Sequence, residues 1–485
     1  METQPAGMII ESDGANLIIQ VTSDQVEVGS ILRAVDAYGI VTAMRYKEDA
    51  TIGSRHLLQA DLQIFGRLID GRIRKIKRPL EPYLHVYFAG KQELETLLSG
   101  EDRIAIGVIY GTKARALLKA SEFDRHIAIL ASTGSGKSYT AANLIKEYAR
   151  LKLPVLIVDT HGEYPSLIEP LSKENKFQVE VLTVKHARSG MKQFKIPVSD
   201  LEPSDFHHFI PSLTDPQQNA LEAVIEDVRK NKEHYLIDDL AEACSRLPVA
   251  TTKGGTAGIG TYHEGTVGAL QRKLKSLSRN FKDVFSTHGT DITTLIEPGQ
   301  VTIIDVSLSQ TAVRQAVVSY LAKELLKGRM NAVHEMEGDR IENPLMLLIE
   351  EAHNYAANNL NASCKHQLSR LASEGRKFGI GLVVVSQKPS KIDEEILSQC
   401  NTGIYMHITN PNDKEHIRKS FECINDTIIR DLDSLDVAEC IIAGALVDVP
   451  FLLCKIDSID VPKHKKHKFE FKTKKKQNTA GFDYA

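Results

Sequence analysis

The sequence predicts an α/β protein in which a small β-barrel precedes a mostly parallel sheet, and a helical insertion interrupts that sheet. From about residue 104 onward, apolar runs that suit buried strands alternate with helix-like segments. Before residue 100, short β-branched runs are instead separated by turn residues such as Asp13-Gly14 and Asp70-Gly71. Short strands with regular turns are typical of a small barrel.

Changes in pattern divide the chain into five predicted segments. The barrel covers 1–100, the first part of the α/β core covers 104–201, and the second part covers 292–455. Between the two parts, the insertion at 202–291 contains Asp215-Pro216, which we interpret as an N-cap and first helical residue. A basic helix is predicted at 271–282. The remaining segment, 456–485, holds a lysine-rich run that we expect to be solvated, and transient contact with DNA or a partner is the alternative.

Composition indicates a protein of more than one domain without a membrane span. The chain has 485 residues, of which 42% are hydrophobic and 25% are charged. Its longest apolar runs fall far short of the ~18 residues that a spanning helix needs. The six cysteines are scattered and never spaced C-x-x-C, so we expect reduced thiols and a cytoplasmic protein. Because the formal net charge is −3, any nucleic-acid site must be local.

The segment ILASTGSGKSYT (129–140) has the pattern of a phosphate-binding loop, except that Ala131 stands where glycine is usual. It follows a short apolar run and precedes a helical apolar stripe, which is the strand–loop–helix context that such a loop requires. Lys137 is expected to reach the β- and γ-phosphates, and the Ser138 hydroxyl to ligate Mg²⁺. The predicted nucleotide-binding residues of this loop are Gly134, Ser135, Gly136, Lys137, Ser138 and Tyr139.

Two adjacent carboxylates end the apolar run in PLMLLIEEAHNY (344–355). Glu350 is placed to hold Mg²⁺ through its water shell, and Glu351 to polarise the attacking water. A second strand candidate, LIVDTHGEY (156–164), ends with Asp159 and Glu163. Glu163 competes with Glu351 as a base or metal-shell residue, and a purely structural cap is the alternative reading of these two acids.

Two further segments carry polar groups suited to a triphosphate. VVVSQKPS (383–390) ends a strand with Ser386 and Gln387, and we interpret the Gln387 amide as a sensor of the γ-phosphate rather than a plain turn residue. LSRLASEGRKFGIG (368–381) carries Arg376, which we choose as the guanidinium that reaches a neighbouring subunit's γ-phosphate. A surface salt bridge is the alternative for any single arginine in this segment.

Together these motifs resemble the HerA family of hexameric DNA-translocating ATPases, relatives of FtsK in the RecA-like group. The resemblance covers nearly the whole chain, and its most specific block is EGRKFGIGLVVVSQKPSKIDEEILSQCNT (374–402). It implies a homohexamer with ATP and Mg²⁺ bound between subunits. It also implies a HAS-type N-terminal barrel, a RecA-like core, an inserted helical bundle and a C-terminal brace.

The resemblance assigns further roles. Arg125, just before the P-loop strand, is expected to contact nucleotide at a subunit interface, and the backbone at Ala443 and Gly444 to lie close to the adenine. Lys137, Glu351 and Arg376 take the P-loop, catalytic-base and trans-arginine roles.

The sequence departs from the family pattern at Ala131, in place of glycine, and at Glu350, in place of aspartate. Neither change removes a phosphate ligand or the second carboxylate, so we expect an active enzyme.

The leading hypothesis is a hexameric ring ATPase that translocates along or unwinds double-stranded DNA. The resemblance implies a partner that docks on the barrel, either a NurA-type nuclease in DNA repair or another effector enzyme in antiviral defence. The basic helix and Lys388 are candidate contacts to the DNA backbone. The alternative is an ATP-gated scaffold that assembles and regulates an effector without moving along DNA. A membrane-anchored secretion pump is disfavoured because we find no membrane segment.

Overall fold

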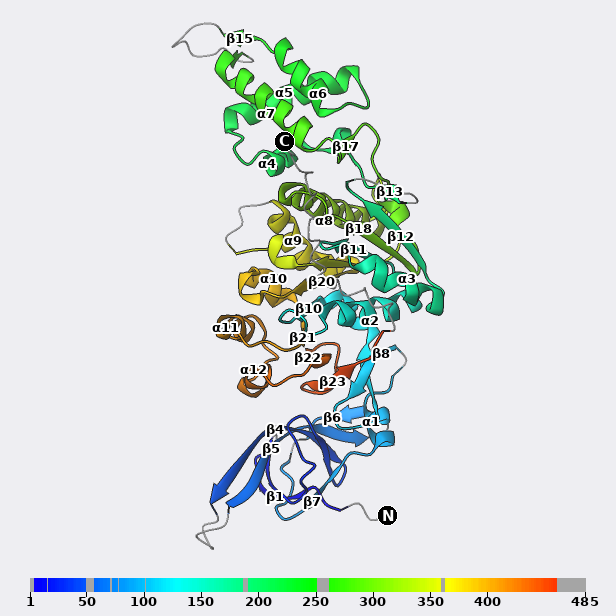
Figure 1. Cartoon of the computed structure of the whole chain (residues 1–485), viewed down its shortest axis with the longest axis vertical. Helices are drawn as coiled ribbons and strands as arrows, with labels where there is room; N and C mark the ends of the chain where they lie inside the picture. Colours follow the sequence, from blue (N-terminus) through cyan, green and yellow to red (C-terminus); the bar gives the residue numbers. More distant parts are fainter. Residues whose placement is uncertain are drawn as a thin grey trace, which may run out of the picture.

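A computed structural model describes residues 4–14, 16–48, 56–69, 72–76, 78–100, 102–185, 191–250, 261–358 and 363–459. Its three parts follow one another along the long axis of the molecule (Figure 1). The N-terminal barrel lies at one end, a large sheet flanked by helices fills the middle, and a group of helices forms the other end. The predicted C-terminal brace lies, from residue 460 onward, outside the described residues.

The N-terminal part is a seven-stranded antiparallel sheet of order β2-β1-β7-β3-β4-β5-β6. Its first six strands close into a barrel because β2 also pairs with β5, and β6 pairs with β5 outside this ring. Alternate side chains point inward and form a separate buried core that includes Ile9, Leu17 and Val86. Helix α1 (Lys91–Leu97) follows the last strand of this sheet. The strands of the sheet are β1 (Gly7–Ser12), β2 (Asn16–Val21), β3 (Ile31–Ala34), β4 (Ala37–Glu48), β5 (His56–Ile69), β6 (Arg72–Arg74) and β7 (His85–Phe88).

The central part is a twelve-stranded sheet of order β13-β12-β18-β11-β19-β20-β10-β21-β22-β23-β8-β9. Strands from β13 to β21 run parallel, and β22, β23, β8 and β9 continue the sheet with antiparallel pairings. The parallel strands are β10 (Ile127–Leu130), β11 (Val155–Asp159), β12 (Gln178–Thr183), β13 (Lys192–Gln193), β18 (Gln300–Asp305), β19 (Leu345–Glu350), β20 (Ile380–Ser386) and β21 (Thr402–Tyr405). The antiparallel strands are β8 (Arg103–Ile109), β9 (Arg115–Lys119), β22 (Glu439–Gly444) and β23 (Leu452–Ile456).

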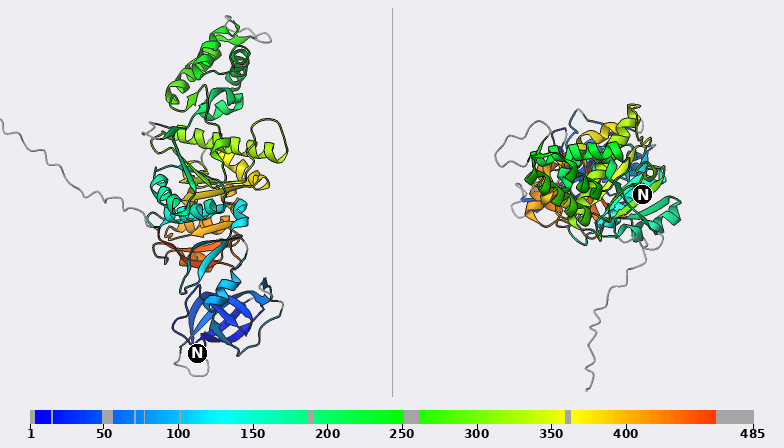
Figure 2. Two further views of the ribbon diagram at one scale, coloured as in Figure 1. Left: turned by 90° about the vertical axis from the view of Figure 1, so that its right-hand side faces the viewer. Right: turned by 90° about the horizontal axis from the view of Figure 1, so that it is seen from above.

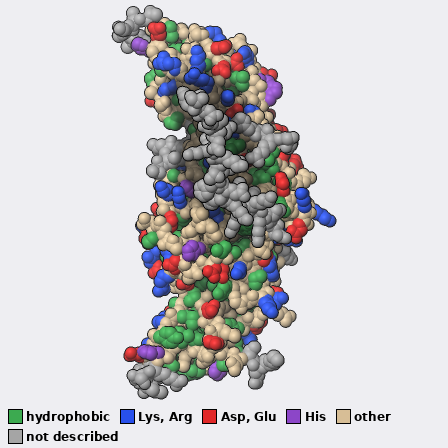
Figure 3. Space-filling view, in the orientation of Figure 1, with side chains coloured by type: hydrophobic (Ala, Val, Ile, Leu, Met, Phe, Trp, Pro, Cys, Tyr) green, Lys and Arg blue, Asp and Glu red, His purple; other side chains and the backbone are tan. Residues whose placement is uncertain are grey.

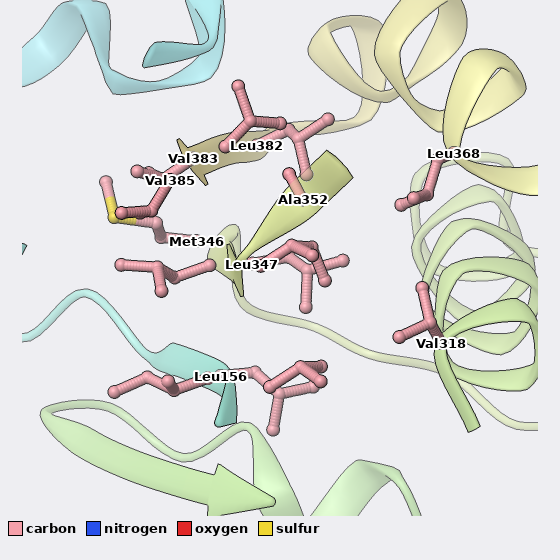
Figure 4. Close-up of a cluster of buried hydrophobic side chains, with 14 of the residues drawn as sticks. Leu156, Val318, Met346, Leu347, Ala352, Leu368, Leu382, Val383 and Val385 are labelled. Atoms are coloured by element: carbon pink, nitrogen blue, oxygen red, sulfur yellow. The ribbon is translucent and has the colours of Figure 1, made fainter. Parts of the chain in front are cut away.

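Helices on the faces of this sheet bury its apolar strands, as parallel sheets require (Figure 2). In the core, Leu347 of β19 and Leu382 of β20 lie near Val318 and Leu368 of the covering helices (Figure 4). The helices of this part are α2 (Lys137–Arg150), α3 (Tyr164–Asn175), α8 (Thr311–Val333), α9 (Ser363–Glu374), α10 (Glu394–Gln399), α11 (Pro411–Ser420) and α12 (Asp426–Asp431). The α/β class with a mostly parallel sheet and an N-terminal barrel is therefore confirmed.

The helical end of the molecule consists of α4 (Phe206–Phe209), α5 (Asp215–Asn231), α6 (Ile237–Ala243) and α7 (Glu264–Asn280). Two chain segments connect this end to the core, and they pair with each other through the short strands β14 (Ile196–Pro197) and β17 (Phe285–Ser286). Within the helical end, β15 (Val249–Ala250) pairs with β16 (Tyr262–His263). The predicted N-cap Asp215 is wrong by one residue. Thr214 caps α5, and its N–H donates to Oε1 of Gln217 at 3.2 Å. The five segment boundaries remain predictions.

No helix in the described ranges combines the length and apolar character that crossing a membrane would demand.

Candidate nucleotide-binding site

The P-loop joins β10 to α2, and its conformation explains how alanine fits its first position. The two residues of this loop with left-handed backbones are Gly134 (φ +83°) and Gly136 (φ +106°), and α2 begins directly after them at Lys137. Ala131 is fully buried, and its N–H donates to the carbonyl of Ser386 at 3.2 Å. Position 131 thus continues the strand-like pairing with β20, so a side chain there meets no backbone strain.

Lys137 and Glu351 form a buried ion pair across the loop. Nζ of Lys137 lies 2.7 Å from Oε1 of Glu351, and the two side chains are 11% and 3% exposed. The amide Nε2 of Gln387 donates to the same carboxylate oxygen at 2.7 Å, and the Thr133 hydroxyl donates to Oε1 of Gln387. The P-loop lysine, the predicted base and the predicted sensor therefore form one connected network.

Glu351 is held in an unusual conformation directly after β19. Its backbone is left-handed (φ +49°, ψ +49°), a region that costs a glutamate about 1–3 kcal/mol and that tends to occur at functional sites. Nδ1 of His353 lies 3.2 Å from Oε2 of Glu351 and 3.1 Å from Oγ of Ser386. Burial raises the pKa of Glu351, but His353 and Lys137 outweigh it and lower the pKa to about 2. This carboxylate is ionised at neutral pH.

Glu350, the preceding residue, experiences the opposite environment. Its Oε2 accepts the backbone N–H groups of Thr160 and His161 at 3.1 and 3.3 Å. Burial, followed by the nearby carboxylate of Asp159, raises the pKa of Glu350 to about 8. The charge of Lys137 opposes this rise without overcoming it.

Asp159 acts as the cap of the turn that leads into α3. Its Oδ1 accepts N–H groups from His161, Gly162 and Glu163 at 3.2, 2.8 and 3.3 Å, and its Oδ2 accepts that of Tyr164 at 2.9 Å. These bonds occupy the carboxylate, so Asp159 fixes the loop that carries Glu163. The sequence allowed two interpretations of Asp159, a functional acid and a structural cap. Its contacts are those of a structural cap.

The residues beside the loop fit a magnesium ion. Oγ of Ser138 donates to Oε2 of Glu163 at 3.4 Å, and Glu350 is a buried carboxyl whose raised pKa a nearby cation would lower. The described ranges contain no group of three or more histidine, cysteine or acidic side chains able to hold a metal ion. A P-loop magnesium ion needs no such group, because phosphate and water supply most of its ligands.

Two other predicted residues of the loop have distinct surroundings. The Ser135 hydroxyl donates to the carbonyl of Ser132 at 2.7 Å, and its own carbonyl accepts the N–H of Ala438 at 3.0 Å. Tyr139, on the first turn of α2, is 44% exposed. The segment that contains Ala438 thus borders the P-loop, which nothing in the sequence indicated.

Arg125 and Arg376 lie at the opposite edge of the sheet from the P-loop. Arg125 ends the short helix η1 (Ala120–Arg125) just before β10, and Arg376 belongs to η7 (Gly375–Phe378) just before β20. The two strands are parallel and in register, so both arginines precede the amino ends while the P-loop follows a carboxyl end. Both line a cavity of about 330 Å³. The seven residues of β20 span about 20 Å, too far for either arginine to reach its own P-loop.

Ala443 and Gly444 also lie away from the P-loop of the same chain. Gly444 pairs with Thr402, which in turn pairs with Ile127 at the amino end of β10. Its backbone is left-handed (φ +119°), and an added Cβ would lie 2.0 Å from the carbonyl oxygen of Asn401. If these two residues border an adenine, the P-loop that holds the nucleotide belongs to another subunit.

His126 fixes the arginine-bearing segment. Its Nε2 lies 2.8 Å from the carbonyl of Ala372 on α9, and its Nδ1 accepts the N–H of Leu382 on β20 at 2.9 Å. Burial lowers the pKa of His126 to about 4, so the imidazole is neutral at pH 7. It therefore joins the two elements on either side of Arg376.

Sequence reasoning missed the contributions of Thr133, His353 and Ser386 to the network around Glu351. His353 stands two residues after Glu351 in the motif already quoted, but a histidine at that spacing has no chemical signature of its own. The contact that shows the position of His353 in the network is the one with Ser386 of β20, and no local sequence pattern predicts a contact between these two segments.

The fold and the site define a P-loop nucleoside triphosphatase. A family described as "Helicase HerA, central domain" matches residues 104–325. The DNA double-strand break repair helicase HerA of Saccharolobus solfataricus is 30% identical over 381 residues, which are 77% of this chain and 72% of the relative. A probable helicase of Methanocaldococcus jannaschii is 30% identical over 397 residues, 81% of this chain and 74% of the relative. The chain belongs to the HerA helicase family and is an ATP hydrolase of the helicase type.

Two solved structures share the fold. VirB4 of Thermoanaerobacter pseudethanolicus superposes with a TM-score of 0.52 at 15% identity, over 74% of this chain and 98% of that one. The plasmid coupling protein TrwB in complex with ADP and Mg²⁺ has a TM-score of 0.51 at 11% identity, over 77% of this chain and 93% of that one. At these identities the likeness is one of fold alone.

The buried neutral His126 predicts a loss of stability in acid. The unfolded imidazole takes up a proton below pH 6.5, whereas the folded one resists until about pH 4. Stability should therefore fall as pH decreases through this window, by at most ~3 kcal/mol from this group. Urea denaturation at pH 7 and pH 4.5 should show a smaller loss for His126→Gln than for the wild type. Equal losses in the two proteins would contradict this.

Proposed function

We propose that this chain forms a ring-shaped homohexamer that hydrolyses ATP between subunits to translocate along or unwind double-stranded DNA. The observation that carries the proposal is the division of the site between opposite edges of one sheet. The phosphate loop with Lys137 and Glu351 lies at one edge, and Arg125 and Arg376 lie at the other. One chain thus holds two incomplete halves, and a neighbour in head-to-tail contact completes each of them.

The ion pair between Lys137 and Glu351 is the resting state of the site in this proposal. A triphosphate in the loop competes for the ammonium of Lys137, because phosphate oxygens carry more negative charge than a single carboxylate. Transfer of Lys137 to the phosphates releases Oε1 of Glu351 to polarise the attacking water. It also removes one of the two groups that lower the pKa of this carboxylate, so Glu351 becomes a stronger base on nucleotide binding.

The surrounding residues take supporting roles. Gln387 already donates to Glu351 and is positioned to exchange that bond for one to the γ-phosphate. Glu163 contacts the hydroxyl of Ser138, so we assign it to the metal shell and leave the base role to Glu351. Arg376, with Arg125 beside it, supplies the transition-state charge to the neighbouring subunit.

Ser138 and Glu350 are the residues that would hold the magnesium ion, with Glu163 reaching its water shell. When bound, the ion would neutralise phosphate charge. A cation at this site would lower the raised pKa of the Glu350 carboxyl. Solved structures of TrwB contain ADP with Mg²⁺ or a non-hydrolysable ATP analogue, which supports the use of both by a chain with this fold.

We further propose that a nuclease or antiviral effector docks on the barrel, and that the protein works in the cytoplasm. The barrel exposes large apolar side chains, including Val35 (61%), Tyr46 (72%) and Tyr83 (76%), which an effector would cover. All six cysteines are free thiols, in keeping with a reducing compartment.

Duplex DNA should stimulate ATP hydrolysis if the protein is a motor. Steady-state hydrolysis measured with and without duplex DNA should rise on addition of DNA, and the rise should shrink as salt increases, because counterion release drives backbone binding. Lys137→Ala should abolish hydrolysis with and without DNA. Hydrolysis that ignores DNA at low salt would contradict translocation and favour an ATP-gated scaffold.

Arg376 should act across the subunit boundary. Arg376→Ala and Lys137→Ala are each expected to lose about 10³-fold or more in kcat. Mixed at equal amounts, dissociated and reassembled, the two variants should recover about a quarter of wild-type activity, since a quarter of random interfaces pair an intact loop with an intact arginine. Arg370→Ala is a matched control, because this nearby arginine pairs with Glu374 of its own helix. A mixture as inactive as its components would contradict the shared site.

His353 should position Glu351 and tune its basicity. His353→Ala is expected to lower kcat about 10–100-fold with little change in KM for ATP. Because His353 lowers the pKa of Glu351, its removal should also move the acidic limb of the kcat–pH profile to higher pH. His353→Asn keeps an N–H close to the Nδ1 position and should restore part of both properties. If His353→Ala lowers kcat but leaves the acidic limb of the kcat–pH profile at the same pH, His353 has only a structural role.

A further inference from the structure

We propose that one exposed face of α7 binds the phosphate backbone of duplex DNA, an inference that rests on the proposed function. This face carries Arg272, Lys275 and Arg279, here called the α7 stripe, and Lys282 follows just after the helix ends. Their spacing of three, four and three residues places them in one row along the helix. All four residues are exposed.

The opposite face of α7 anchors the helix. Val267, Leu270, Leu274 and Leu277 are buried at helical spacing and pack into the helical end of the molecule. Because this packing fixes the rotation of α7, the stripe must point to solvent. It cannot turn inward without exposing four apolar side chains.

The stripe has no ionic partner in the part of the chain that the structure describes. None of the ion pairs among the described residues includes Arg272, Lys275, Arg279 or Lys282. The neighbouring Lys273 behaves differently, since it points inward and its Nζ donates to Oε1 of Gln217 at 2.6 Å. Stripe residues thus keep their donors free for an external anion.

The helix leaves room for a bulky polyanion beside these charges. Gly265 and Gly268 lie on the same face, seven and four residues before Arg272. An added Cβ at Gly265 would meet nothing within 4 Å, and one at Gly268 would meet only the Arg272 guanidinium at 3.5 Å. The bare backbone there allows close approach of a large surface.

A row of charges of this length fits a nucleic-acid backbone rather than a small anion. From Arg272 to Arg279 the helix rises about 10 Å, which is several charge spacings of duplex DNA. Lysine and arginine side chains are visible at this end of the molecule, with acidic side chains among them (Figure 3). Contacts from lysine and arginine to phosphates carry no sequence information, so binding through the backbone should not depend on DNA sequence.

The test compares salt dependence of DNA binding in matched variants of the full-length protein. Affinity for two unrelated 30-base-pair duplexes is measured over a range of salt concentrations without nucleotide. For Lys275→Ala/Arg279→Ala, the slope of log affinity against log salt should fall by about 1.8, since each lost phosphate contact contributes about 0.9. Arg279→Lys should keep the wild-type slope.

The control variant is Lys232→Ala/Arg246→Ala, which removes one lysine and one arginine from the same helical end. These two are already paired, Lys232 with Asp239 at 2.5 Å and Arg246 with Asp227 at 2.6 Å. The control should therefore bind DNA with the wild-type slope although its net charge changes equally.

Each outcome decides the matter. A slope reduced only in the stripe variant supports the proposal. If the wild type binds DNA and the stripe variant has the same slope as the wild type, the α7 stripe does not bind the DNA backbone. The proposed function is not affected by that result. If the stripe variant changes the oligomeric state but not the slope, this face is a subunit contact and the proposal is wrong. A wild type that binds no duplex at all overturns both.

Discussion

The parallel alignment of β10, β19 and β20 is the constraint on which the rest of the molecule depends. Parallel strands bring all their carboxyl ends to one edge of a sheet and all their amino ends to the other. At the first edge, Lys137, Glu351 and Gln387 meet although they come from distant parts of the sequence. At the second edge, Arg125 and Arg376 share a cavity. The same geometry keeps these two arginines away from the phosphate loop of their own chain.

Adjacent carboxylates illustrate how strongly local surroundings control chemistry. Glu350 and Glu351 are neighbours in sequence and both are buried, yet the pKa of the first is raised to about 8 and that of the second is lowered to about 2. Another carboxylate faces Glu350, whereas an ammonium and an imidazole face Glu351. Environments that push the pKa values of two titratable groups apart commonly mark different roles, and the proposed function assigns Glu350 to the magnesium ion and Glu351 to the attacking water.

A buried ion pair such as that between Lys137 and Glu351 contributes little net stability, because removing two charges from water costs as much as their attraction returns. In the proposed function its value is instead functional. There the pair holds the lysine and the glutamate in place until phosphate oxygens compete for the lysine, so that nucleotide binding releases the base. The left-handed backbone of Glu351 suits such a site, since strain there persists only where surrounding contacts fix it.

The sequence by itself determined the features that depend on neighbours along the chain. The strand–loop–helix pattern identified the phosphate loop, and the structure has its left-handed turns at Gly134 and Gly136, which is why Ala131 is accommodated. Only the tertiary structure decided which strand ends meet. It joined Lys137 to Glu351 across 214 residues, assigned Asp159 to a capping role, and revealed His353 between Glu351 and Ser386. It also placed Ala443, Gly444 and Arg376 at the amino ends of the parallel strands, away from the P-loop of the same chain. Periodicity and turn chemistry are local and can be read from short segments, whereas strand order and register depend on packing between segments that no local pattern specifies.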